Sequence, residues 1–100
     1  LSMLHESPEH DWTLDSMAEL AHLSRSAFAL RFVQVVGIPP LTYLTHWRMA
    51  VARNLLAQGQ AVKAVASQVG YGNATAFARA FQRASGQSPS AWQMEHLSQP

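Results

Sequence analysis

The chain has 100 residues, of which 48% are hydrophobic and 13% are charged. This composition excludes a disordered chain, and the length allows one small domain or two very small ones that share a helix. The absence of cysteine excludes disulfide frameworks, thiol nucleophiles and cysteine-based zinc sites.

The charge is distributed unevenly along the chain, although the net charge is only +1. Residues 1–23 contain acidic residues and no Lys or Arg, whereas residues 24–100 contain all seven basic residues and a single acid, Glu95. This asymmetry favours a polyanionic partner, with nucleic acid before a membrane surface, while solvated surface charge remains the alternative. No apolar run approaches the roughly 20 residues of a membrane span, and the N-terminus lacks a signal-peptide pattern. We therefore expect a cytoplasmic protein with no membrane partner.

The first predicted elements are two short helices joined by a tight turn. Thr13 is the expected N-cap of a helix over about 14–22, and Ser24 that of a helix over about 25–36. Two helices joined in this way form a helix-turn-helix unit, predicted here over 13–37. A continuous helical pattern over 40–57, ended by Gly59, then predicts one long helix of roughly 25 Å.

The second half of the chain has the same order of elements. Helices over about 61–69 and about 73–84, the latter capped by Asn73, predict a second helix-turn-helix unit over 61–86. A closing helix is predicted over about 89–97. The sequence therefore predicts one all-α domain over 1–100, with about seven helices forming two helix-turn-helix subdomains joined by one long linker helix.

An internal repeat is the strongest signal in the sequence. Five residues recur 49 positions later with every spacing preserved: Phe28, Phe32, Gly37, Pro40 and Tyr43 return as Phe77, Phe81, Gly86, Pro89 and Trp92. Each Phe pair lies on one helix face, the glycine suits a left-handed helix end, and the proline suits the first turn of the next helix. Two such units could place two recognition helices in successive major grooves, about 34 Å apart. The repeat and the charge thus predict binding to double-stranded DNA.

The side chains opposite the Phe pairs are the candidates for reading DNA. In the first copy this outward face holds Ser26, Leu30 and Val33, and in the second copy Thr75, Arg79 and Gln82. Arg79 occupies the repeat position of Leu30, so we predict hydrogen-bonded base readout mainly through Arg79 and Thr75. The first helix would contribute Arg25, Ser26 and thymine-methyl contacts from Ala29 or Leu30. The complete predicted set is Arg25, Ser26, Ala29, Leu30, Asn73, Ala74, Thr75, Arg79 and Arg83.

Several of these residues have a second interpretation. Arg79 and Arg25 could contact phosphates or be solvated charges, and Leu30 could be an ordinary exposed apolar residue. Arg48 and Arg53 on the long helix could position phosphates, and Arg48 could equally make a structural pair with the second subdomain. The six repeat aromatics are interpreted as core residues because their spacing follows the packing face.

Catalytic and metal-binding patterns are not found in the sequence. None of the five histidines is paired with another at close helical spacing, so no metal or cofactor is expected. There is no glycine-rich phosphate loop, nucleophile elbow or carboxylate pair, so the chain is not expected to be an enzyme. The competing functions are a helical protein-interaction module that docks a partner through Leu30 and Val33, and a DNA-binding domain without sequence preference.

The run from Trp12 to Trp92 resembles the DNA-binding domain of the AraC/XylS family of bacterial transcription regulators. The resemblance rests on an ordered set of residues: Ser24-Arg25-Ser26, Phe28, Phe32, Gly37, Pro40, Tyr43-Leu44, Arg48, Ala52, Leu55-Leu56, Val65-Ala66, Gly70-Tyr71, Phe77, Arg79-Ala80-Phe81, Gly86 and Pro89. It implies a DNA operator as partner and RNA polymerase as a further partner if the protein is an activator. The sequence around 27–32 and 43–49 is similar to the branch of the family with an N-terminal cupin-like sensor. This similarity, together with a first residue other than Met, predicts a sensor domain upstream.

The sequence departs from this family at three places. The family usually has a basic residue where Leu30 stands, Lys or Arg where Gln82 stands, and Tyr-Arg where Trp92-Gln93 stands. The departure at Leu30 agrees with hydrogen-bonded base readout concentrated in the second recognition helix.

Overall fold

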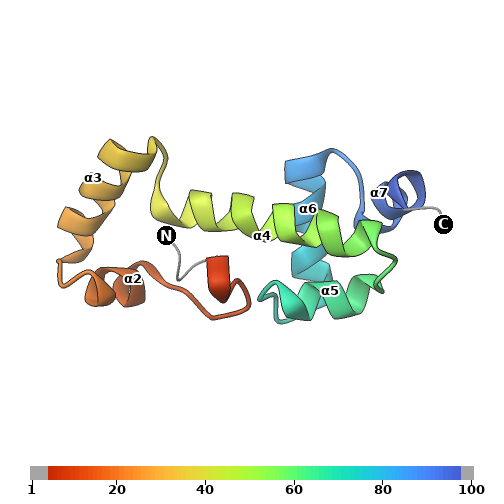
Figure 1. Ribbon diagram of the computed structural model, residues 1–100, viewed down its shortest axis with the longest axis horizontal. Helices are drawn as coiled ribbons and strands as arrows, with labels where there is room; N and C mark the ends of the chain where they lie inside the picture. The colour runs from red at the N-terminus through yellow and green to blue at the C-terminus, as the bar shows by residue number, and fades with distance from the viewer. Residues whose placement is uncertain (1–4, 98–100) are drawn as a thin grey trace.

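A computed structural model describes residues 5–97 of the chain, and Figure 1 shows its helices in chain order. Within these residues there are six helices with defined bounds and no strand. They are α2 (Leu14–Leu20), α3 (Arg25–Val36), α4 (Pro40–Ala57), α5 (Val62–Gln68), α6 (Ala74–Ser85) and α7 (Pro89–His96). His5 and Glu6 are helical as well. The fold is all-α, as the sequence predicted, with six defined helices in the described part where about seven were expected.

The helix starts are fixed by hydrogen bonds from side chains. Thr13 and Ser16 form a reciprocal capping box at the start of α2. Ser24 accepts a hydrogen bond from the Ala27 amide at 3.2 Å, and Asn73 accepts one from the Ala76 amide at 2.8 Å. These contacts satisfy amides that the first turn of a helix leaves without a backbone partner, so α3 and α6 begin where the sequence places their caps.

The helix ends explain where the bounds differ from the prediction. α2 ends at Leu20, two residues before the predicted end, and His22 just beyond it takes a left-handed conformation with φ of 59°, with which a right-handed helix cannot continue. α3 and α6 end at glycines in the left-handed region, Gly37 with φ of 96° and Gly86 with φ of 77°. Glycine takes this conformation without a Cβ penalty, so both helices stop at equivalent repeat positions.

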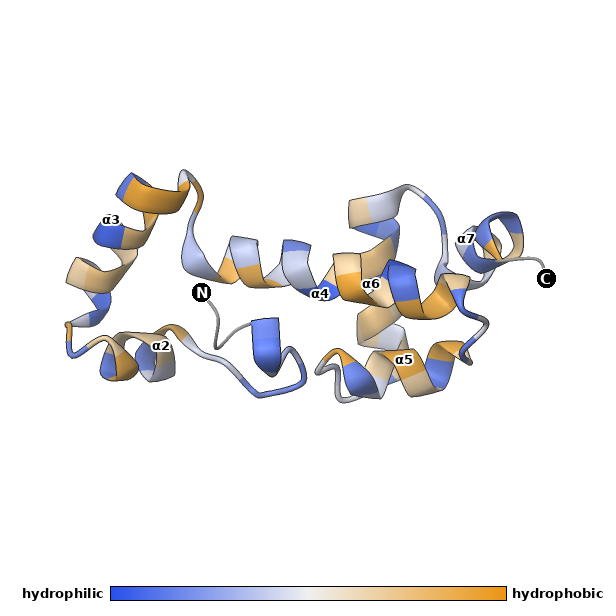
Figure 2. Ribbon diagram, viewed as in Figure 1, coloured by the Kyte–Doolittle hydropathy of each residue, from blue (hydrophilic) through white to orange (hydrophobic). Residues whose placement is uncertain are grey.

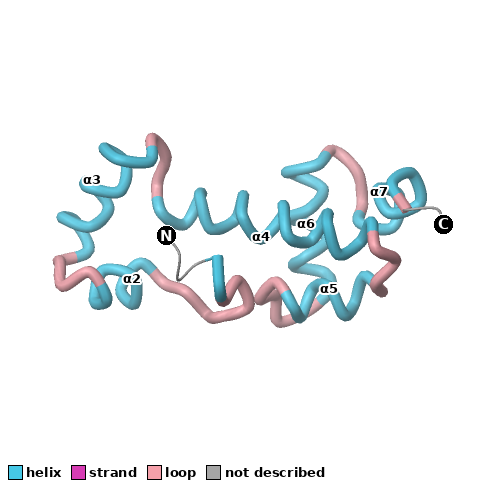
Figure 3. Tube along the Cα trace, in the orientation of Figure 1, coloured by secondary structure: helices cyan, strands magenta, loops and turns pink. Residues whose placement is uncertain are grey.

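The long helix α4 lies between two groups of helices (Figure 1). It packs against α3 at one end and against α5, α6 and α7 at the other, and α2 packs on α3. The molecule is elongated, measuring 46 × 25 × 22 Å. Figure 3 shows that short loops join the helices, and that α3 lies at one end of the molecule whereas α6 lies within the helical group at the other end; the two helices run in similar directions in this view.

The two ends of the molecule differ in how well they are packed. Around α5 and α6 a continuous core contains fully buried Phe77 and Phe81, together with Met49 and Leu56 of α4. The other core has only Met17 and Leu44 buried, with half-buried Trp12, Phe28 and Tyr43 around them. No residue of α3 is buried, although Figure 2 shows apolar residues along this helix, most clearly toward its C-terminal end. The repeat in the sequence is therefore not a repeat in packing.

Candidate nucleic-acid interface

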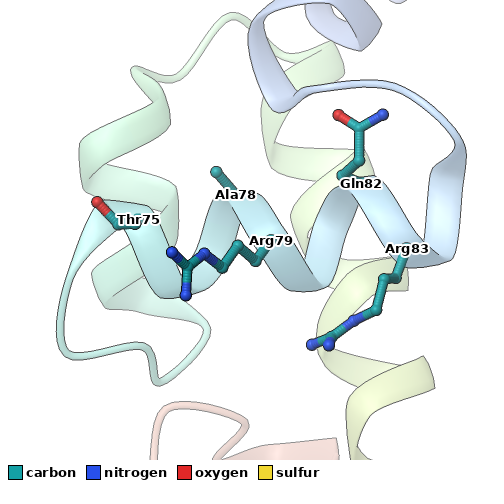
Figure 4. A pocket seen from close by; sticks show the side chains of 5 residues that line it. All are labelled: Thr75, Ala78, Arg79, Gln82 and Arg83. Atoms are coloured by element: carbon teal, nitrogen blue, oxygen red, sulfur yellow. The ribbon is translucent and has the colours of Figure 1, made fainter.

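The exposed face of α6 carries the strongest candidate site. Phe77 and Phe81 are buried on the core side of this helix, which turns Thr75, Arg79 and Arg83 toward the outside. These three side chains, with Ala78 and Gln82, line an open hollow of ≈ 430 Å³. In Figure 4 the Arg79 side chain extends toward Thr75, while Gln82 and Arg83 point to opposite sides of the helix in the view.

Both arginines on this face are free of ion pairs in the described part of the chain. The single salt bridge found among residues 5–97 joins Arg25 to Asp15. Arg79 and Arg83 also make no side-chain hydrogen bond with residues 5–97, and both are exposed. Two exposed guanidinium groups on one helix face, next to a hydroxyl and an amide, can hydrogen-bond to phosphates and to base edges.

The remaining residues predicted on α6 lie at its first turn. The side-chain oxygen of Asn73 is engaged in the N-cap, so this residue supports the helix start with that atom. Ala74 is exposed beside it. Gln82 was placed on the outward face by the sequence but not among the predicted DNA-binding residues; it lines the hollow and donates a 3.4 Å hydrogen bond to the Gly86 carbonyl. The same helical spacing that selected Arg79 would have selected it.

The equivalent face of α3 has a different chemistry. Shifting the hollow-lining residues of α6 back by the 49-residue repeat gives Ser26, Ala29, Leu30, Val33 and Gln34. Leu30 is 62% exposed and Val33 is 39% exposed, and Ser26 is exposed as well. Ala29 is half-buried. This face has no cation and two exposed apolar side chains in the places of Arg79 and Gln82.

Arg25, predicted to contact DNA from α3, is engaged with a neighbouring helix. Its Nε lies 3.3 Å from a carboxylate oxygen of Asp15 on α2, and both side chains are about two-thirds exposed or more, at 66% and 73%. An exposed ion pair of this kind adds little stability and exchanges readily with other partners. Arg25 is therefore still accessible to a phosphate, but it is not on the outward face of α3.

The contacts of Arg48 are structural, which favours the structural interpretation of this residue over a phosphate contact. Its Nε donates to the Pro8 carbonyl at 2.9 Å and its Nη2 donates to the His10 carbonyl at 2.7 Å. The guanidinium also lies over the ring of Tyr71, 5.8 Å from the centroid. Burial lowers the pKa of Arg48, and burial raises the pKa of Tyr71 against the opposing effect of the Arg48 charge. Arg48 thus ties the N-terminal segment to the turn before α6.

Other kinds of site receive no support from the described residues. Across residues 5–97, no group of three or more His, Asp and Glu side chains is arranged to hold a metal ion. No single helix in that range is long and apolar enough to cross a membrane. The pair α3 and α4 passes the same length and composition test together, with a bend of 56° between them.

Comparison with known proteins gives relatives along most of the chain. The family described as a helix-turn-helix domain matches residues 17–95. A putative AraC-like transcription regulator of Streptomyces antibioticus is 43% identical over 90 residues, covering 89% of this chain and 30% of that protein. The RCS-specific HTH-type transcriptional activator RclR of Escherichia coli K12 is 37% identical over 90 residues, covering 89% of this chain and 32% of that protein. The chain therefore spans about a third of the length of the curated relatives it matches.

Solved structures with the same fold cover nearly the whole chain. The C-terminal domain of AraT, a response regulator from Geobacillus stearothermophilus, superposes with a TM-score of 0.91 at 28% identity, covering 98% of this chain and 83% of that one. The DNA-binding domain of AdpA, a global transcriptional factor solved in complex with a target DNA, gives a TM-score of 0.90 at 28% identity, covering 94% and 86%. The similarity thus extends over both helical groups and α4.

Proposed function

The chain belongs to the helix-turn-helix domain family of AraC-like transcription regulators, and we propose that it binds double-stranded DNA in a sequence-specific way as the DNA reader of a bacterial regulator. The exposed face of α6 carries this proposal. It presents Thr75, Arg79 and Arg83 from a helix anchored by two buried phenylalanines, with no competing ion pair among the described residues. Arg79 is assigned to a base edge and Arg83 to a phosphate.

We further propose that the chain contains two helix-turn-helix units, α2–α3 and α5–α6, with α4 as the helix that joins them. Eighteen residues of α helix extend about 27 Å, and the molecule is 46 Å long. Like faces of successive major grooves lie about 34 Å apart, which is within the length of the molecule, and we assign α3 and α6 to two such grooves on one side of a duplex. The DNA-binding domain of AdpA, solved in complex with a target DNA, supports DNA binding by this fold, because that domain and this chain align over most of their length.

The whole protein would have further parts and partners. Because the chain spans about 30% of its curated relatives, we propose an additional sensor domain in the same polypeptide, and RNA polymerase as a partner if the regulator is an activator. The family consists of DNA-binding regulators, so no enzymatic role is assigned. A cytoplasmic location is proposed because the DNA that it would regulate is there.

The proposal is tested by selecting duplexes from a random pool with this domain and measuring their binding by fluorescence anisotropy at two salt concentrations. A selected site with two elements about one helical turn apart supports a bipartite reader. Salt-sensitive binding without any selected sequence would reduce the function to general DNA contact, and no binding at low salt would favour the protein-interaction alternative.

A pair of variants separates base readout from general electrostatics. Arg79→Ala should weaken binding to the selected site by about 1–3 kcal/mol and relax the preference at one base position. Lys63→Ala removes one positive charge from α5, away from the hollow on α6, and should leave the sequence preference unchanged. An Arg79→Ala protein with unchanged affinity and preference would refute the role of Arg79.

A further inference from the structure

We infer that α3 reads thymine through its C5-methyl group, with Leu30 as the specificity-determining residue and Val33 beside it, so that one element of the operator is recognised without a hydrogen bond from the central position of the helix. This inference rests on the proposed DNA-binding function and names the base chemistry of its first half. It assigns the two halves of the protein to two different kinds of DNA element.

Leu30 and Arg79 occupy the same position of the repeat. Leu30 stands 49 residues before Arg79, and Val33 stands 49 residues before Gln82, in helices that begin at equivalent capped positions. Leu30 therefore holds, in α3, the position from which Arg79 is proposed to reach the base edges in α6. The structure keeps this counterpart facing outward, with 62% of Leu30 exposed.

Packing among the described residues does not explain the exposure of Leu30 and Val33. Leu30 and Val33 belong to neither of the two buried clusters, and α3 buries no residue. Two exposed apolar side chains at the centre of a recognition face contribute a favourable free energy of burial only when another molecule covers them.

The major groove offers an apolar side chain one suitable partner. Thymine is the base that offers an apolar group there, its C5-methyl, whereas guanine, cytosine and adenine present donors and acceptors. A leucine placed against a guanine or adenine edge would remove water from polar atoms without replacing their hydrogen bonds, which is unfavourable. Leucine against a thymine methyl removes only apolar surface from water.

The expected effect follows from the size of one methyl group. Covering a methyl-sized apolar group is worth a factor of about four in affinity. Deoxyuridine lacks this methyl but keeps the pairing and the O4 acceptor of thymine, so it removes the proposed contact alone. Loss of affinity on replacing thymine by deoxyuridine is therefore a direct measure of methyl contact.

The experiment uses the duplex selected by the domain from the random pool, with deoxyuridine in place of thymine in one element or in the other. The wild-type domain should lose about fourfold in affinity per contacted methyl in one of the two duplexes only. Leu30→Ala should bind the parent duplex more weakly and lose the difference between thymine and deoxyuridine. Val35→Ala is the matched control, because Val35 is an even more exposed apolar residue of α3, at 77%, on a different side of the helix.

Each outcome has a distinct meaning. Equal binding of the parent and both deoxyuridine duplexes, or a thymine preference that survives Leu30→Ala, would overturn the inference while leaving sequence-specific binding intact. Failure to select any sequence would overturn the proposed function, and the inference with it. Circular dichroism of Leu30→Ala checks that the helices are intact, which the exposure of Leu30 leads us to expect.

Discussion

The difference in packing between the two halves can be measured with one substitution made at both repeat positions. Phe81 is completely buried, and its ring lies 5.7 Å from that of Phe77 and 5.9 Å from that of Trp92. Phe32 has equivalent neighbours, with its ring 5.8 Å from Phe28 and 5.7 Å from Tyr43, but it is only half-buried. The two positions have the same spacing and ring neighbours at equivalent repeat positions, and they differ in how much water the surroundings exclude.

Phe81→Ala should therefore cost more stability than Phe32→Ala. Removing a fully buried phenylalanine side chain costs about 3–5 kcal/mol, from lost burial and from the cavity left behind. At Phe32 water already reaches part of the ring and can fill the space that the substitution opens, so we expect about half that cost, ~2 kcal/mol. In a small domain stabilised by about 5–15 kcal/mol, the two values are easily separated.

Urea denaturation followed by circular dichroism is the assay, and the midpoint and slope are compared with those of the unmodified chain. Phe81→Leu provides a milder change if Phe81→Ala leaves too little folded protein to analyse. Hydrogen exchange then localises the effect: amides of α3 should exchange faster than those of α6 in the unmodified domain, because α3 buries no residue. Equal costs at Phe32 and Phe81, or slower exchange in α3, would refute the packing argument.

Three other predictions concern the turn before α6 and the positive charge on the exposed face of α6. Gly70→Ala should lower the stability measured in urea more than Gly37→Ala does. Both glycines have positive φ (+90° and +96°), but only at Gly70 would a Cβ lie 2.9 Å from a backbone oxygen. Equal losses of stability would contradict this clash. In a Tyr43→Phe variant Tyr71 is the only tyrosine, and because burial raises its pKa, its ionisation followed by absorbance should have a higher midpoint in the folded than in the urea-unfolded chain. The stability linked to Tyr71 should accordingly be complete below the unfolded pKa of about 10 and decrease as pH rises through the folded pKa, and coincident midpoints would contradict this. Arg83→Ala should reduce the slope of log affinity against log salt by about 1 with an unchanged base preference, and a changed preference would move Arg83 from the phosphate to a base.

Much of the fold could be predicted from the sequence because the relevant interactions are local. Ser24 and Asn73 cap the helices that follow them, and Gly37 and Gly86 end those helices, through contacts with residues at most four positions away. Such contacts depend on short spacings that the sequence displays directly. The outward positions of Leu30 and Arg79 follow in the same way from helical geometry and the Phe pairs.

Contacts between distant segments could not be predicted. Nothing local in the sequence reveals that Arg48 would reach back 40 and 38 residues to the carbonyls of Pro8 and His10. Likewise, Gln93 departs from the family pattern in type, and only the structure shows its Nε2 donating to the Leu56 and Gln60 carbonyls at 3.0 and 2.7 Å. The unequal burial of Phe32 and Phe81 could not be predicted either, because identical spacing shows which face of a helix turns inward but not how much of the chain covers that face.

The difference in packing and the difference in chemistry between α3 and α6 fit each other. A hydrogen bond from a guanidinium to a base edge requires donor–acceptor distances near 3 Å and good alignment, so it is effective only from a firmly held helix. Arg79 has this support, since Phe77 and Phe81 beneath it are fully buried. Burial of apolar surface against a methyl group has no preferred direction and tolerates small shifts. A loosely packed helix can therefore use an apolar residue such as Leu30 to contact a base. Leu30→Arg should give α3 less base discrimination than Arg79 gives α6, unless the packing beneath α3 is improved as well.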